Sequence, residues 1–381
     1  WLRRAVKPNG EHYYEYVLCY VDDIMSILYE PSRALKQIQE KFKFKKDKMS
    51  PPEIYLGGNI TKRIINDHEV WTLCSRNYVK AAIDTIIKAA TKRGMTINHK
   101  PKVPMHATYY PELDTSDELE GEDITFYQEI IGIMRWAIEL GRVDIHLEVS
   151  LMSAYQASPR RGHLEELLHI VAFLKHQPKL TLYFDPEYAN VDESIFINNS
   201  SPEQFKDLYR DAKEELPERM PKPLGASVRI TAFVDASHAA NKVNRRSHTG
   251  YVLFINRSPI TWYSKRQNTV ESSTFSSEFI AMKTCMESIV SLRFKLRMFG
   301  VPIDGPADVM CDNQSVVSNS SCIDSSLNRK HNALAYHATR WAVAAGVIRV
   351  GKIDAKDNIA DAFTKRLTYM QRTHLFHQWT Y

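Results

Sequence analysis

Between residues 227 and 381, four carboxylates adjoin segments whose apolar composition is typical of a protein core. They are Asp235, Glu278, Asp312 and Asp361. Carboxylates avoid such positions unless they are paired or bind a cation. Four converging carboxylates form a site for hard divalent metals, which promote phosphodiester hydrolysis. The fold of this segment must therefore provide the four carboxylates with a shared partner such as a bound cation.

The order of elements around the four acids predicts a mixed sheet covered by helices. The expected elements are strands at 228–234, 249–255 and 260–264, a helix from near Ser276, a strand at 308–311, two helices after Asn313, a strand at 347–353 and a helix from near 357 or 358. Asp235 and Asp312 are expected at strand ends, where ligands collect in such sheets. Glu278 and Asp361 are expected in first helical turns, where the helix dipole favours negative charge.

Each acid also has a purely local interpretation. A strand-end turn explains an Asp, a helix N-terminus explains a Glu, and an Asx turn explains Asp361. Four acids in this element order favour a shared metal site over four independent local roles.

Six ordered motifs surround these acids, and the segment from Ala232 to Leu367 resembles the ribonuclease H domain of copia-type retrotransposon polyproteins. The motifs are Phe233-Val234-Asp235-Ala236-Ser237, Arg246-Ser247-His248-Thr249-Gly250-Tyr251, Trp262-Tyr263-Ser264-Lys265-Arg266-Gln267, Ser272-Ser273-Thr274 with Glu278-Phe279-Ile280-Ala281, Asp312-Asn313-Gln314-Ser315, and Asn358-Ile359-Ala360-Asp361-Ala362-Phe363-Thr364-Lys365.

This resemblance implies a ribonuclease H-like fold and hydrolysis of the RNA strand of an RNA–DNA hybrid. It also implies two Mg²⁺ ions, which Mn²⁺ can replace, with Asp235 as the bridging ligand and Glu278, Asp312 and Asp361 completing the shells. Retroviral relatives often carry a His about ten residues before the last Asp, where this chain has Gly351. No histidine is assigned as the general acid, and what replaces it is left open.

Basic residues in the same segment are candidates for contact with nucleic acid. They are Arg246, Lys265, Arg266 and Lys330. Solubility alone could explain them, but Arg246 and Lys265 lie within the family-like motifs. The net charge of +5 permits a polyanionic partner without requiring one. We therefore expect these side chains to contact hybrid phosphates, which positions a duplex without reading its sequence.

The N-terminal part contains a second acidic motif. Residues 13–29 are expected to form a hairpin whose turn holds Asp22 and Asp23, and Tyr20-Val21-Asp22-Asp23 resembles the YxDD motif of reverse transcriptases. The resemblance implies that Asp22 and Asp23 are metal ligands of a polymerase site. Only 19 residues precede Tyr20 and none is an Asp, so that site is expected to be incomplete. The remainder of the polyprotein, with the fingers and palm, is the expected partner.

The length of 381 residues predicts two or three domains. We expect a partial palm with the YxDD hairpin and thumb at 1–105, a connection region and linker at 106–222, and the ribonuclease H domain at 223–381.

Helices are expected at 31–48, 78–90, around 130–138 and at 162–175, and a strand at 54–60. The acidic run at 112–123 is expected to be a solvated linker, and the polar, proline-containing segment at 185–225 marks the clearest boundary.

Composition indicates the cellular compartment in which the chain is expected. The five cysteines are scattered without CxxC spacing, which is typical of reduced thiols. No run of about 18 apolar residues occurs, so no membrane partner is expected. The expected location is cytoplasmic, in a virus-like particle, with the nucleus as a further compartment. The oligomeric state is left open.

Two other functions compete with the nuclease. A catalytically inactive hybrid-binding or structural module from a degenerate element is the main alternative, and the presence of all four acids argues against it. A transposase or integrase core of the same fold is less favoured, because such cores typically use three acids and lack the YxDD motif.

Overall fold

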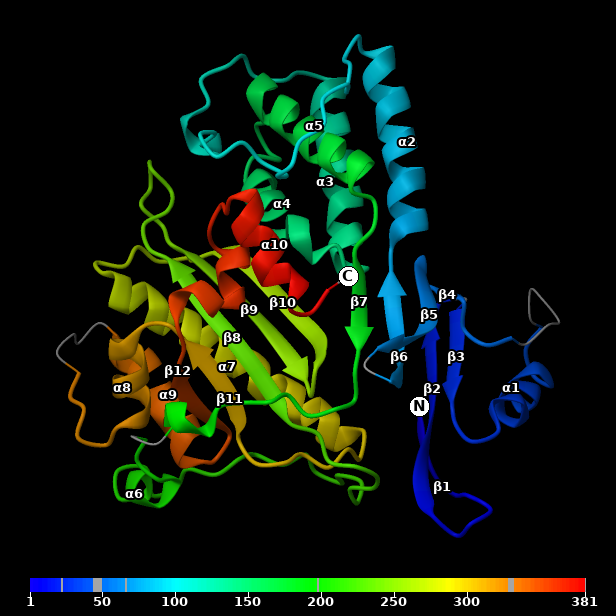
Figure 1. Ribbon diagram of the computed structural model, residues 1–381, viewed down its shortest axis with the longest axis vertical. Coiled ribbons are helices and arrows are strands. Elements are labelled where there is room, and N and C mark those ends of the chain that lie inside the picture. Colours follow the sequence, from blue (N-terminus) through cyan, green and yellow to red (C-terminus); the bar gives the residue numbers. More distant parts are fainter. Residues whose placement is uncertain (22, 44–49, 66, 197–198, 328–331, 381) are drawn as a thin grey trace.

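The computed structural model describes residues 1–21, 23–43, 50–65, 67–196, 199–327 and 332–380, and its strands form three sheets (Figure 1). The largest sheet lies in the C-terminal part, and two smaller sheets lie in the N-terminal part beside a group of helices. Within the described ranges, no helix has the length and apolar character needed to cross a membrane.

The C-terminal sheet has the strand order β10-β9-β8-β11-β12. Its strands are β8 (Ile230–Ser237), β9 (His248–Ile255), β10 (Ser258–Arg266), β11 (Ala307–Cys311) and β12 (Ile348–Lys352). The first three form antiparallel pairs joined by short connections, whereas β11 runs parallel to both β8 and β12. Parallel neighbours need crossover connections, and helices supply them here. The mixed five-stranded, ribonuclease H-like sheet expected from the sequence is confirmed.

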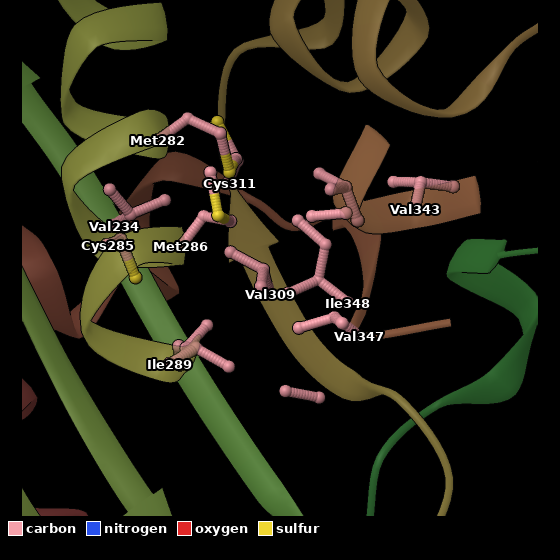
Figure 2. Close-up of a cluster of buried hydrophobic side chains, with 14 of the residues drawn as sticks. Val234, Met282, Cys285, Met286, Ile289, Val309, Cys311, Val343, Val347 and Ile348 are labelled. Atoms are coloured by element: carbon pink, nitrogen blue, oxygen red, sulfur yellow. The ribbon is translucent and has the colours of Figure 1, made fainter. Parts of the chain in front are cut away.

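Helices cover one face of this sheet. They are α7 (Thr274–Met298), α8 (Gln314–Ser321) and α9 (Ala333–Ala344). Helix α7 packs on β8 and β9, and the side chains of Val234, Met282, Ile289, Val309 and Ile348 meet between these layers (Figure 2). Successive residues of a strand point to opposite faces, so Val234 belongs to this core.

The opposite face of the sheet is also buried. Phe233 and Val252 point toward it and pack with Phe363 and Trp379, which follow the last strand. Helix α10 (Tyr369–His377) and the 3₁₀ helix η6 (Ile359–Phe363) contribute to this second core. Burial on both faces explains why β8 and β9 read as nearly continuous apolar runs.

The polar segment at 185–225 packs onto the C-terminal sheet. It contains η3 (Glu193–Phe196) and α6 (Pro202–Lys206), and Phe205 is fully buried in the core that α7 covers. A side chain at Gly351 would meet Ile195 and Phe196 at 2.6–2.7 Å, so only glycine permits this approach of η3 to β12. The segment is therefore an integral layer of the C-terminal unit, and the boundary at residue 223 stays a prediction.

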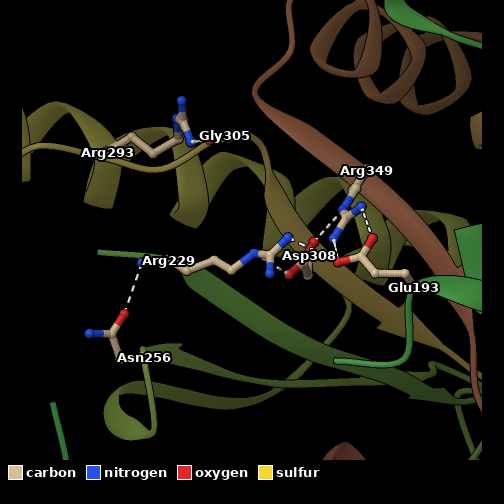
Figure 3. A network of polar contacts seen from close by, with 7 residues as sticks. All are labelled: Glu193, Arg229, Asn256, Arg293, Gly305, Asp308 and Arg349. Carbon is tan, nitrogen blue, oxygen red and sulfur yellow. Dashed lines mark hydrogen bonds and ion pairs between the residues drawn. The ribbon is translucent and has the colours of Figure 1, made fainter. Parts of the chain in front are cut away.

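An ionic network fastens the same segment to the sheet edge (Figure 3). The buried Asp308 carboxylate forms ion pairs with Arg229, just before β8, and with Arg349 on β12. Arg349 also donates two hydrogen bonds of 2.6 and 2.9 Å to Glu193 in η3. Since Arg349 is shared by both carboxylates, it joins β11, β12 and η3 into one unit.

The N-terminal part contains the two smaller sheets. The first joins β1 (Leu2–Val6), β2 (His12–Tyr20) and β3 (Asp23–Ile27); the second joins β4 (Ile54–Tyr55), β5 (Gly58–Ile65), β6 (His68–Cys74) and β7 (Thr181–Phe184). The expected hairpin is confirmed as β2–β3, and β1 was not predicted. The single strand expected at 54–60 is wrong: Leu56 and Gly57 have φ of 53° and 91° and turn the chain between β4 and β5.

Helices fill the space beside the second sheet. They are α2 (Arg76–Lys92), α3 (Glu122–Glu139), α4 (His146–Ser153) and α5 (Arg161–His176), with short 3₁₀ turns at η1 (Pro111–Leu113) and η2 (Val143–Ile145), whereas α1 (Pro31–Gln39) lies beside β3 of the first sheet. Helices α2 to α5 share one apolar core and confirm the helices expected at 78–90, 130–138 and 162–175. The helix expected at 31–48 ends at Gln39, and residues 44–49 lie outside the described part.

The acidic run at 112–123 is not a solvated linker. Asp114 accepts hydrogen bonds from the Tyr109 hydroxyl at 2.7 Å and from the Ser116 amide at 2.9 Å, and Leu119 is buried. Glu112 accepts a hydrogen bond of 2.7 Å from the backbone of Lys242, which lies beyond β8. This segment therefore connects the helices to the C-terminal sheet.

Candidate metal centre and nucleic-acid cleft

The four predicted acids come from four different elements. Asp235 lies inside β8, opposite Gly250 of β9, rather than at the strand end that was expected. Asp312 directly follows β11, and Glu278 lies near the start of α7. Asp361 lies in the first turn of η6, so the helix expected to begin near residue 357 or 358 is only a short 3₁₀ helix, and the last α-helix begins at Tyr369. The Asn358 side chain accepts from Ala360 N and donates to Val234 O, which holds this turn against β8.

The structure brings these acids into two overlapping groups. Ligand atoms of Asp235, Asp312 and Asp361 all lie within 4.8 Å of one another. Asp312 also forms such a group with Glu278 and the Cys311 sulfur. The sheet thus gathers residues 126 positions apart in the chain at one edge of β8 and β11.

Burial and mutual repulsion raise the pKa values of Asp235, Glu278 and Asp361. Burial and then the charges of Asp235 and Asp312 raise the pKa of Glu278 to about 10. Burial and the charge of Asp235 raise the pKa of Asp361 to about 7, and burial raises the pKa of Asp235 itself. The buried Glu278 Oε2 has no hydrogen-bond partner among the described residues. Carboxylates so arranged are relieved by a bound cation, so the residues fit a divalent metal.

Cys311 does not add a thiolate to this ligand set. Its side chain is buried, and burial raises the pKa of the thiol well above its usual value. The donors that remain are carboxylate oxygens, which suit Mg²⁺ or Mn²⁺ better than soft metals.

Two further residues belong to the site and were not assigned from the sequence. Lys365 Nζ lies 3.2 Å from Asp235 Oδ1 and 2.7 Å from Asp361 Oδ1, and the Thr364 hydroxyl donates to the other oxygen of Asp235. The two carboxylates raise the pKa of Lys365, so its ammonium stays charged. Thr364 and Lys365 end the last family-like motif, which was the available signal for them.

A cleft of 450 Å³ adjoins the acids. Its lining includes Lys365 and His238, together with the predicted nucleic-acid residues Arg246 and Arg266. Further cations in its wall are Lys242, Arg245 and Arg366. The aromatic side chain of Tyr110 lies across the cleft wall, with the Arg366 guanidinium 4.0 Å from its ring centre.

Of the other two predicted contact residues, the structure describes only Lys265. Lys265 is exposed but does not line the cleft, because adjacent residues of β10 point to opposite faces of the sheet. Lys330 lies outside the described residues.

Of the two YxDD carboxylates, the structure describes only Asp23. Asp22 lies outside the described residues, and Asp23 opens β3, where it is exposed and pairs with Tyr20. In the described part of the chain, Asp23 belongs to none of the groups of three or more possible metal ligands.

Comparison with known proteins relates the chain to transposon polyproteins, although no family model matches it. It is 24% identical over 359 residues to the retrovirus-related Pol polyprotein from transposon RE1 of Arabidopsis thaliana, covering 93% of this chain and 21% of the relative. It is 27% identical over 278 residues to the putative transposon Ty5-1 protein of Saccharomyces cerevisiae, covering 71% of this chain and 73% of the relative. A secreted RxLR effector protein of Plasmopara viticola is 30% identical over 171 residues, which is 45% of this chain and 94% of that protein.

The chain therefore spans about a fifth of the length of the transposon RE1 polyprotein. Among solved structures, the ribonuclease H1 called LC11, in complex with an RNA/DNA hybrid, is 14% identical with a TM-score of 0.30. That similarity covers 36% of this chain and 94% of the other. The N-terminal ribonuclease H domain of Rv2228c from Mycobacterium tuberculosis is 15% identical with a TM-score of 0.29, and covers 36% and 91% of the two chains.

Proposed function

This chain belongs to the retrovirus-related Pol polyproteins of copia-type LTR retrotransposons, and we propose that its C-terminal domain is a metal-dependent ribonuclease H. Its substrate is the RNA strand of an RNA–DNA hybrid. The observation that carries this proposal is the convergence of Asp235, Asp312 and Asp361 within 4.8 Å, beside a cleft lined by arginine and lysine.

The four carboxylates Asp235, Glu278, Asp312 and Asp361 would hold two divalent ions, with Mg²⁺ as the physiological metal and Mn²⁺ as a substitute. Asp235 would be the ligand that the two ions share. When bound, the metals supply an activated water and stabilise negative charge at the phosphate. The chain itself holds Asp235 in place through the Thr364 hydroxyl and neutralises Asp361 through Lys365.

The cleft beside the acids binds the hybrid backbone. Arg246 and Arg266 contact phosphates there, and these contacts set the register of the duplex without reading bases. The ring of Tyr110 lies against Arg366 and fixes the direction of that guanidinium. A phosphate on this path approaches the carboxylates next to Lys365, which lies in both the cleft and the acidic cluster.

The remaining assignments follow the same family. Residues 1–105 correspond to a partial palm and thumb, 106–222 to the connection region, and 223–381 to the ribonuclease H domain. Asp22 and Asp23 are ligands of the polymerase site of the parent polyprotein, which is the partner of this segment. The location is the cytoplasm, within virus-like particles, with the nucleus as a further compartment.

Cleavage of a labelled RNA–DNA hybrid tests the nuclease. The wild-type chain should cut the RNA strand in Mg²⁺ and not in chelator, and Asp235→Asn should abolish cutting while leaving the circular dichroism spectrum unchanged. Asp304→Asn, which changes an exposed carboxylate after α7, is the matched control and should cut normally. Full activity of Asp235→Asn would rule out the proposed site.

The same assay distinguishes the main alternative. An inactive hybrid-binding or structural module would retain the hybrid in a filter-binding measurement, yet release no fragments in Mg²⁺ or Mn²⁺. Cleavage by the wild type excludes that alternative.

A further inference from the structure

A second group of possible metal ligands lies in the helical part of the chain. Ligand atoms of His106, Glu166 and His169 all lie within 4.8 Å of one another. Glu166 and His169 are buried on α5, and the exposed His106 lies on the segment between α2 and α3. A fourth side chain is close, because His99 Nε2 lies 3.1 Å from His169 Nδ1.

The hydrogen bonds of His169 fix which of its ring nitrogens carries the proton. Its Nε2 lies 3.0 Å from Val103 O, and a carbonyl oxygen can only accept, so Nε2 carries the proton. In the neutral ring Nδ1 therefore presents a lone pair, and it faces His99. A backbone carbonyl behind a histidine is the usual outer partner of a metal-binding imidazole.

Glu166 is held in a comparable way. Its Oε1 accepts a hydrogen bond of 2.7 Å from the backbone amide of His106, which fixes the carboxylate. Its Oε2 lies 2.8 Å from His106 Nδ1. Oε1 thus fixes the position of the carboxylate, and Oε2 lies beside the His106 imidazole.

These spacings suit a tetrahedral ion. Zinc-to-nitrogen distances of about 2.0–2.1 Å place neighbouring ligand atoms roughly 3.3 Å apart. The His106 and Glu166 ligand atoms are 2.8 Å apart, and those of all three residues lie within 4.8 Å of one another, so metal binding would draw the three side chains closer together. Imidazole and carboxylate together favour zinc-like metals, whereas Mg²⁺ prefers oxygen ligands and retained waters.

We propose that His106, Glu166 and His169 form a site for Zn²⁺ or a similar transition metal. This site is separate from the carboxylate cluster and does not depend on the proposed nuclease function. It differs from the acidic cluster in metal preference, because two of its three ligands are imidazoles.

The site joins segments that are distant in the sequence. His99 and His106 lie on the extended segment after α2, and Glu166 and His169 lie one helical turn apart on α5. The same segment continues to Tyr109 and Tyr110, whose backbone and ring contact Arg366 beside the acids. A bound metal therefore anchors the segment that forms one wall of the cleft.

Zinc binding by the full chain tests this proposal. Chelator-treated protein is titrated with Zn²⁺ in excess Mg²⁺, which occupies the oxygen-ligand site, and bound zinc is measured by elemental analysis after gel filtration. We expect one Zn²⁺ per chain and a higher thermal unfolding temperature. His106→Ala should weaken zinc affinity by at least about 10-fold and remove the thermal shift.

Two further variants make the result decisive. Glu166→Gln keeps an oxygen to accept from the His106 amide, so it should fold normally and still lose zinc affinity. His176→Ala changes an exposed histidine at the end of the same helix and should bind zinc like the wild type. The proposal fails if the wild type takes up no stoichiometric zinc, or if His106→Ala and Glu166→Gln bind it as tightly as His176→Ala does.

Discussion

Lys365 Nζ lies 2.7 Å from Asp361 Oδ1, four residues earlier in the chain. The same ammonium lies 3.2 Å from the fully buried carboxylate of Asp235. A fixed cation of the chain therefore stands among carboxylates that are proposed to bind divalent metal. It offsets part of their repulsion, and it also competes with a metal for the same oxygens.

Replacing this cation should change how strongly the chain responds to Mg²⁺. In chelator, Lys365→Met should lower the free energy of unfolding by about 1 kcal/mol, because Asp235 and Asp361 lose their nearest positive charge and the lysine is partly exposed. Mg²⁺ should then raise the unfolding temperature of the variant more than that of the wild type. Thermal unfolding with and without Mg²⁺ measures both effects.

A lysine with the same sequence spacing provides the control. Lys283 pairs with Glu287 four residues later on α7, and both side chains are partly or fully exposed. Lys283→Met should leave the Mg²⁺ response unchanged. Equal Mg²⁺ responses in Lys365→Met and the wild type would show that Lys365 does not compete with the metal.

Glu278→Gln should separate stability from activity. The raised pKa of Glu278 means that the folded state holds its proton more tightly than the unfolded state, so stability is lost as the pH rises from 4.5 toward about 10. Glutamine removes this cost, and in chelator at pH 7 it should stabilise the fold by about 1–3 kcal/mol. Hybrid cleavage should fall by at least about 100-fold, because a metal ligand is lost. Lower stability of the variant in chelator would contradict this account.

Adjacent residues of β10 should differ in their effect on hybrid binding. Arg266 lines the cleft and Lys265 does not, so Arg266→Ala should weaken hybrid affinity more than Lys265→Ala. Loss of one phosphate contact should also reduce the slope of log affinity against log salt by about 1. Filter binding at several salt concentrations measures both quantities. Equal effects of the two variants would place the hybrid elsewhere.

Buried histidines should make the chain sensitive to mild acid. Burial lowers the pKa of His248 to about 3 and that of His146 to about 4, from an ordinary value of 6.5. The unfolded chain therefore takes up these protons first, so stability is complete above pH 6.5 and is lost as the pH falls. Each residue should contribute about 1.4 kcal/mol per pH unit below that point.

Substitution of His248 measures how much this residue contributes to the pH dependence of stability. His248 Nε2 lies 2.9 Å from Ser264 Oγ, and the serine hydroxyl donates to Phe363 O, so the imidazole must donate to the serine. His248→Gln keeps a donor there and should reduce the pH dependence of urea unfolding between pH 6.5 and 5. The exposed His374→Gln is the control. An unchanged pH dependence in His248→Gln would exclude His248 as a source of the acid sensitivity.

The sequence predicted the C-terminal sheet because its strands are short apolar runs bounded by turn residues. This pattern is local and can be recognised within a few residues. Errors arose where local patterns conflict with packing. The turn at Leu56 and Gly57 divides an expected strand, and η6 replaces an expected helix because Asn358 bonds to both Ala360 and Val234. In both places the backbone geometry depends on contacts that the pattern of apolar residues along the sequence does not predict.

By itself, the sequence determined which carboxylates are candidates, because an acid beside core residues is unusual wherever it occurs. Only the tertiary structure decided that Lys365 lies among them, and that Arg266 faces the cleft while Lys265 does not. It also decided that His106 meets Glu166, 60 residues later. The physical reason is that secondary structure follows from neighbouring residues, whereas these contacts depend on how separately formed elements pack against one another.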